Sequence, residues 1–163
     1  MDIQELLSKG TKGIAEQRLS EIIRRGVYST NTYIPTISAL RDLEASGNLA
    51  LISDPTIRRE LSQLSYQIDS VDRSFAEYLF FHQHDLDPFI ARNLPIVTFL
   101  SSASGAPVLE KGEADWSSLD SDLARGLLAF KMSLTHNYTQ SLEKLDLLFT
   151  NLIAQIETAI QPL

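Results

Sequence analysis

Apolar side chains recur at helical spacing over most of the chain, most regularly in the stretch 54–87. There they are separated alternately by four and three residues. This spacing predicts an α-helix with one apolar face that packs lengthwise against another helix. Asp54 and Pro55 mark its start, because Asp accepts hydrogen bonds from first-turn amides and proline lacks an N–H that this position does not need. The apolar face consists of Ile57, Leu61, Leu64, Ile68, Val71, Phe75 and Tyr78.

A second apolar stripe predicts a helix over 118–161. Ser117 followed by Asp120 resembles a capping box before it. One helix of this extent is longer than a compact domain of 163 residues is wide, so we expect an elongated molecule. A kink near Gly126 or a break near Asn137 is the alternative. The stripe consists of Leu123, Leu127, Phe130, Leu134, Tyr138, Leu142, Leu145, Phe149, Leu152, Ile156 and Ile160.

Two more segments have helical spacing. Residues 2–26 form a third long helix in this interpretation, although Gly10 and Gly13 weaken it. Residues 36–46 predict a short helix, closed by Gly47 in the left-handed conformation that favours glycine.

One long connection remains, at about 93–117, with two prolines and two glycines. Long connections in small domains are usually functional or mobile. The sequence therefore predicts an all-α fold in a single domain, 1–163. Its architecture is an elongated antiparallel bundle of three long helices, one short helix and this loop.

Composition and charge exclude several classes of function. The chain has no cysteine, which excludes disulfides, thiolate metal ligands and thiol nucleophiles. It has 14 basic and 21 acidic side chains, a net charge of −7, and all of this excess lies in 61–163. Such a surface repels phosphate backbones, so we expect no nucleic-acid partner. No signal peptide and no run of about 20 apolar residues is visible, so membrane contact requires a segment absent from this chain.

Candidate chemistry is sparse. The sequence has no Gly-rich phosphate loop, no zinc-protease motif and no serine-hydrolase motif, so we expect no catalytic residues and no cofactor. His82 and Asp85 are three residues apart, share a face of an α-helix, and are candidate metal ligands, with His136 as a possible third. In the alternative interpretation, His82 is a hydrogen-bonded edge of the core. Trp116 either anchors the acidic loop on the bundle or contacts a partner.

The segment 33–64, together with Tyr66, carries a family resemblance. It combines a short helix ending in Ser46–Gly47, a Leu-x-Leu-Ile link at 49–52, and a helix that opens with Ile57–Arg58 and continues to a tyrosine. This pattern, like the long terminal helix, resembles a family of bacterial single-pass membrane proteins catalogued as a domain of unknown function. The resemblance implies an extramembrane helical module on the extracytoplasmic face, tethered by an upstream membrane helix. It implies no catalytic residues.

We therefore expect a non-enzymatic helical module for sensing or protein interaction, with a protein or small ligand as its partner. A cytoplasmic oligomeric scaffold is the first alternative, because the apolar spacing is sustained enough to support self-association. A metal-binding bundle that uses His82 and Asp85 is the second.

Overall fold

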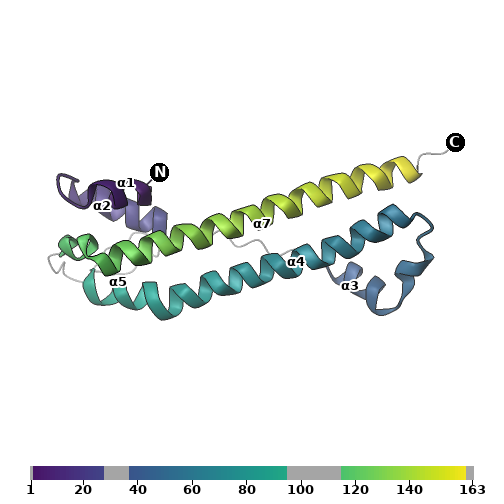
Figure 1. Cartoon of the computed structure of the whole chain (residues 1–163), viewed down its shortest axis with the longest axis horizontal. Helices are drawn as coiled ribbons and strands as arrows, with labels where there is room; N and C mark the ends of the chain where they lie inside the picture. Colours follow the sequence, from purple (N-terminus) through teal and green to yellow (C-terminus); the bar gives the residue numbers. More distant parts are fainter. Residues whose placement is uncertain (1, 28–36, 95–114, 161–163) are drawn as a thin grey trace, which may run out of the picture. The chain divides into compact units, whose positions relative to one another are not determined.

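A computed structural model describes residues 2–27, 37–94 and 115–160, and every regular element in these ranges is helical (Figure 1). The all-α prediction is confirmed for this part of the chain. Most of the predicted long loop, at 95–114, lies outside the described residues. The α-helices are α1 (Asp2–Lys9), α2 (Glu16–Ile22), α3 (Ser38–Ala45), α4 (Pro55–Phe81), α5 (Asp87–Asn93) and α7 (Asp122–Ile160). Shorter turns are the π-helical η1 (Ile23–Val27) and η3 (His82–Leu86) and the 3-10 turns η2 (Asn48–Leu51) and η4 (Trp116–Asp120).

The described residues fall into two compact units. The first unit contains 2–27, 77–94 and 115–135, and the second contains 37–76 and 136–160. Both α4 and α7 contribute residues to each unit. Each unit has its own buried apolar side chains.

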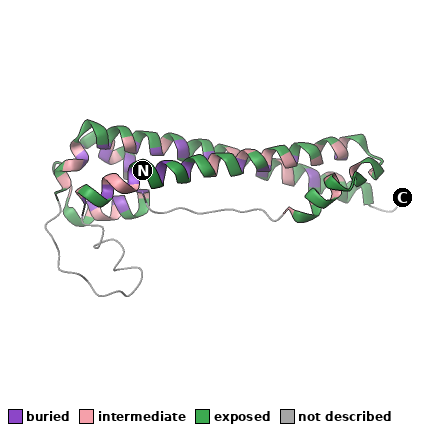
Figure 2. Cartoon of the chain, turned by 90° about the horizontal axis from the view of Figure 1, so that it is seen from below, coloured by how far each residue is buried: buried purple, intermediate pink, exposed green. Residues whose placement is uncertain are grey.

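The core of the second unit follows the predicted apolar spacing. On α4 the buried positions recur every three, four or seven residues, and on α7 they recur every seven (Figure 2). Phe75 of α4 meets Tyr138 of α7 with their ring centroids 5.6 Å apart. Each buried side chain of this size stabilises the fold by about 1.5–3 kcal/mol. The buried members are Ile57, Leu64, Ile68, Val71, Tyr138, Leu145 and Leu152.

The predicted helix ends of this unit are also confirmed. The carboxylate of Asp54 accepts hydrogen bonds from the backbone amides of Thr56, at 2.7 Å, and Ile57, at 3.3 Å. Gly47 closes α3 with φ +72°. Polar contacts then bind α7 to α4: the Gln67 side-chain amide donates to the Ser141 carbonyl at 3.0 Å.

In the first unit, the prediction of one helix over 2–26 is wrong. Helix α1 ends at Lys9, the chain reverses, and α2 begins at Glu16 and packs back against α1 (Figure 1). Gly10 and Gly13 have φ +67° and +82°, a region that side chains other than glycine rarely adopt. The reversal is fixed by Asp120, whose carboxylate accepts hydrogen bonds from the Thr11 backbone amide at 2.7 Å and from the Thr11 hydroxyl.

The predicted capping box before α7 is wrong, because the Asp120 carboxylate binds Thr11 instead of the start of the helix. The hydrogen bonds from the Thr11 hydroxyl and amide lower the pKa of the Asp120 carboxyl. The hydroxyl of Ser121 caps α7 instead, by accepting from the Ala124 amide at 3.2 Å. Helix α7 is one continuous element from Asp122 to Ile160, so the alternative of a break near Asn137 is wrong. The alternative of a kink near Gly126 stays a prediction.

The first turns of α7 present a different face from the predicted one. Leu123 and Phe130, expected in the core, are 64% and 53% exposed. Ala124, Leu128 and Lys131 are buried in their place. Along the first part of α7, the buried face is thus displaced by one residue from the predicted face. This displacement places a lysine in the interior.

Gly10 is the position at which a single methyl group should harm the first unit most. A Cβ there would lie 2.5 Å from Asp120 Oδ1, an atom already held by Thr11, and φ is unfavourable for alanine. We expect Gly10→Ala to lower the free energy of unfolding by about 2 kcal/mol. The control is Gly126→Ala, at a helical position with nothing within 4 Å, which should raise it by about 1 kcal/mol. Urea unfolding measures both, and an unchanged Gly10→Ala variant would contradict the role of this turn.

Candidate functional site

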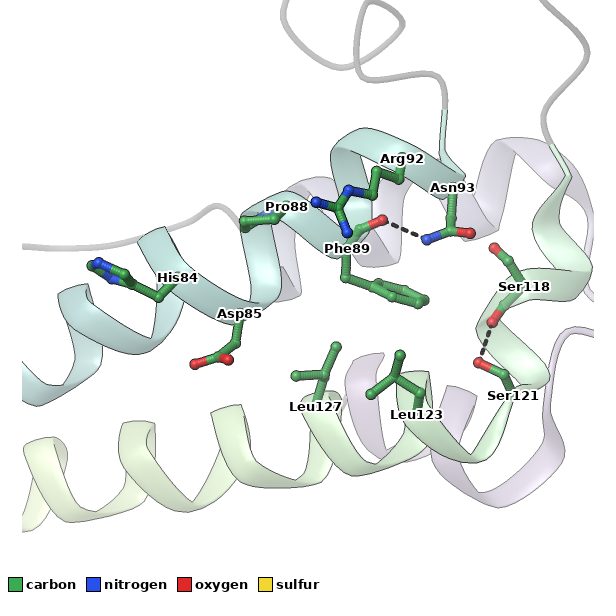
Figure 3. A pocket seen from close by; sticks show the side chains of 10 residues that line it. All are labelled: His84, Asp85, Pro88, Phe89, Arg92, Asn93, Ser118, Ser121, Leu123 and Leu127. Atoms are coloured by element: carbon green, nitrogen blue, oxygen red, sulfur yellow. Dashed lines mark hydrogen bonds between the residues drawn. The ribbon is translucent and has the colours of Figure 1, made fainter.

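The first unit contains an open pocket of about 600 Å³, formed by η3, α5, η4 and the start of α7 (Figure 3). Its volume is within the range of small-molecule sites. One wall comes from the segment that carries the predicted histidine and aspartate candidates. Its lining residues are His84, Asp85, Pro88, Phe89, Arg92, Asn93, Ser118, Ser121, Leu123 and Leu127.

The floor of the pocket is apolar. Phe89 projects from α5, and Leu123 and Leu127 face it from α7 (Figure 3). Phe89 and Leu127 are half-buried, whereas Leu123 is 64% exposed. An apolar ligand group lying here would therefore remove from water a surface that the fold itself leaves uncovered.

Two charged groups of opposite sign stand at this floor. Within the described residues, Arg92 forms no ion pair or hydrogen bond through its guanidinium, and its side chain folds back toward Pro88 (Figure 3). The Asp85 carboxylate likewise has no hydrogen-bond partner in the described part of the chain. At the other end, the Ser121 hydroxyl donates to the Ser118 carbonyl at 2.7 Å.

The π-helical turn η3 sets the position of His82 beside this pocket. A π turn joins residues five apart, and the Asp87 amide accordingly donates to the His82 carbonyl. The same geometry brings the His82 Nδ1 within 3.2 Å of Asp87 Oδ1. Pro88, which has no N–H to donate within a helix, accounts for the irregular turn that precedes it.

His82 belongs to a buried group of titratable side chains with Tyr78 and Lys131. His82 is 7% exposed, and its ring lies 4.5 Å from that of Tyr78. Its Nε2 is buried and has no hydrogen-bond partner among the residues that the structure describes. Burial lowers the pKa of His82; the hydrogen bond and charge of Asp87 oppose this shift and the Lys131 charge adds to it. The imidazole is therefore neutral at pH 7, and Nδ1 donates to Asp87.

Lys131 is 4% exposed and has no carboxylate partner among the described residues. Its Nζ lies 5.4 Å from the centroid of the Tyr78 ring, which is a cation–π contact. Burial lowers the pKa of Lys131 to about 8. The fold thus places an ammonium group and a neutral imidazole together in its interior.

The predicted metal-ligand pair is arranged differently from the expectation. His82 pairs with Asp87 rather than Asp85, because the π turn replaces the α-helical spacing on which the prediction relied. Asp85 lines the pocket, and His136 is exposed on α7 in the second unit. In the ranges that the structure describes, no three His, Asp or Glu side chains gather as a metal site would require.

Trp116 opens η4 and is half-buried, and it is not among the residues that line the pocket. Its role as an anchor or as a partner contact stays a prediction.

Sequence reasoning missed Arg92 and Lys131. Pro88 was the available signal for an irregular helix near His82, whereas nothing in the local sequence marks Arg92 as unpaired.

Comparison of the chain with family models, with curated proteins and with solved structures found no match in any of the three. No helix within the described ranges combines the length and the apolar character needed to cross a membrane. The resemblance to a membrane-tethered family therefore stays a prediction.

Replacing Lys131 by methionine should stabilise the protein, because a buried ammonium has lost its hydration. Between pH 8 and 10.5 the unfolded chain holds a proton here that the folded chain has released, so wild-type stability rises with pH in this window. We expect the advantage of Lys131→Met to shrink by about 3 kcal/mol from pH 7.5 to pH 10.5. Urea unfolding of both proteins measures it.

The exposed Lys144, also on α7, provides the matched control. Lys144→Met should show no such pH-dependent difference from the wild type. An advantage of Lys131→Met that is constant across this pH range would refute the assignment of a buried, shifted lysine.

The pKa of His82 should respond in opposite directions to changes in its two charged neighbours. Asp87→Asn removes the carboxylate charge and weakens the hydrogen bond that raise the pKa of His82, so this pKa should fall. Lys131→Met removes a repulsive charge, so the pKa of His82 should rise. Because the folded pKa lies below 6.5, stability decreases as the pH falls through 6.5, more steeply in Asp87→Asn. An NMR titration of the His82 ring measures the shifts, and two shifts of the same sign would be inconsistent with this geometry.

Proposed function

We propose that the chain is a helical interaction module whose second unit binds a basic amphipathic helix of another protein along α7. The observation that carries this proposal is an apolar stripe that continues past the core toward the end of α7. Its last three isoleucines, Ile153, Ile156 and Ile160, are 54%, 38% and 72% exposed. Isoleucines left in water at helical spacing are typical of a surface that a partner covers.

The stripe has the spacing that a partner helix requires. Phe149, Ile153, Ile156 and Ile160 are separated by four, three and four residues, so they share one face of α7. A hollow of about 300 Å³ adjoins the start of the stripe, lined by Leu142, Leu145, Asp146 and Phe149. A partner helix therefore finds a recess for one anchoring side chain and an apolar track beyond it.

The negative charge beside the stripe favours a basic partner helix. Glu143, Asp146 and Glu157 follow one edge of the stripe at helical spacing. Residues 37–76 and 136–160 carry five basic and nine acidic side chains, a net charge of −4. A second copy of the chain would bring two such surfaces together and repel itself, whereas a helix with Lys or Arg along its edge is attracted.

This function keeps the expectation of a non-enzymatic interaction module and names the kind of partner. The membrane tether and the extracytoplasmic location remain predictions. Self-association as an oligomeric scaffold is the competing use of the same stripe, and the experiment below distinguishes the two.

The test uses the full chain and two designed helical peptides with identical leucine stripes, one with lysine and one with glutamate along its edges. We expect the lysine peptide to bind, with an affinity that falls as salt rises, and the glutamate peptide to bind at least about tenfold more weakly. The variant Ile153→Ser/Ile156→Ser should weaken the lysine peptide at least about tenfold. Fluorescence anisotropy measures each affinity.

Leu147→Ser is the matched control, because Leu147 is 60% exposed but lies on the far side of α7 from the stripe. It should leave the affinity unchanged. Equal binding of both peptides, or unchanged binding by the double isoleucine variant, would overturn the proposal. Sedimentation that shows a dimer broken by the same variant would overturn it in favour of the scaffold.

A further inference from the structure

We propose that the pocket of the first unit binds a small zwitterion with an apolar body, of the class of apolar amino acids and dipeptides. Its cationic end pairs with Asp85, its carboxylate pairs with Arg92, and its apolar part lies on Phe89, Leu123 and Leu127. This inference concerns a different unit from the proposed partner surface and does not depend on it.

The guanidinium of Arg92 is the anion-binding group. Two other arginines of the first unit are paired: Arg18 pairs with Glu21 and Arg25 pairs with the same glutamate, each at 3.1 Å. Arg92 has no such partner in the described residues, although it lines the pocket. A guanidinium presents paired N–H donors that match the two oxygens of a carboxylate.

The carboxylate of Asp85 supplies the opposite charge. Asp85 and Arg92 are seven residues apart, two helical turns, which separates their backbones by about 10 Å along the helix. Pro88 and Phe89 lie between them, and Figure 3 shows Asp85 directed toward α7 while Arg92 folds back over Phe89. The two charges therefore stand at either side of the apolar floor rather than against each other.

A zwitterion matches this arrangement better than a singly charged ligand. A pure anion would leave Asp85 unpaired and would meet the field of a chain with net charge −7. A pure cation would leave Arg92 unpaired. A neutral molecule with both charges satisfies both groups, and its apolar body covers the exposed Leu123. A cavity of about 600 Å³ accommodates a dipeptide with large side chains.

The test titrates the full chain with three probes: the dipeptide Leu-Phe, its N-acetyl form, which is an anion, and its C-terminal amide, which is a cation. We expect Leu-Phe to bind with submillimolar affinity and to shift the NMR methyl signals of Leu123 and Leu127. Each blocked form should bind at least about tenfold more weakly, since each loses one charge-assisted contact.

Two variants assign the charges to the residues. Arg92→Met should remove the difference between Leu-Phe and its amide, and Asp85→Asn should remove the difference between Leu-Phe and its N-acetyl form. Arg24→Met and Asp72→Asn change exposed residues that lie outside the pocket, and they should leave all affinities unchanged. Thermal melts of every variant confirm that it is folded.

Three results would overturn the proposal. The first is equal affinity for the three probes, which would mean that the charges are not used. The second is no shift of the Leu123 and Leu127 signals at about 10 mM dipeptide. The third is an unchanged preference for the zwitterion in both pocket variants.

Discussion

The second unit depends on one interaction, the burial of apolar side chains that repeat along α4 and α7. Val71 is fully buried and Ile68 and Leu145 nearly so, and the polar contacts around them, such as that of Gln67 with Ser141, act on helices that this burial has already brought together. The same repeat is only partly covered, because its last isoleucines on α7 remain exposed to solvent. A stripe made for packing thus becomes, at its end, a surface available to a partner.

In the first unit, hydrogen bonds and backbone geometry determine features of the fold that apolar packing alone does not. Asp120 fixes the reversal after α1, and the π turn at 82–86 brings His82 to Asp87, while Asp85 lines the pocket. The buried Lys131 is the cost of this arrangement, because it occupies a place that an apolar side chain would fill more favourably. Chemistry-bearing residues therefore gather where the regular apolar repeat fails.

This contrast explains how much the sequence could predict. The α4 stripe, the Asp54 cap and the Gly47 turn depend on residues a few positions apart, so the local pattern was sufficient. At the reversal after α1, Gly10 and Gly13 were a local signal of weakness, but the carboxylate that fixes the turn lies 109 residues away from Thr11, beyond the reach of any local pattern. The pairing of His82 with Asp87 depends on a π turn, whereas the prediction assumed α-helical spacing. That Arg92 has no ion pair among the described residues depends on where residues distant in sequence lie.

The contact between Thr11 and Asp120 also has a consequence for synthesis of the chain. When the ribosome has made the α1–α2 hairpin, the carboxylate that holds its turn does not yet exist. At a translation rate of about 5–20 residues per second, Asp120 is made some 5–20 seconds later, so the turn of the hairpin lacks its hydrogen bonds for at least that time. Until then Leu6 and Leu19 lack the residues of α7 that belong to the same unit, so the hairpin gains its full stability only after residue 120 has been made.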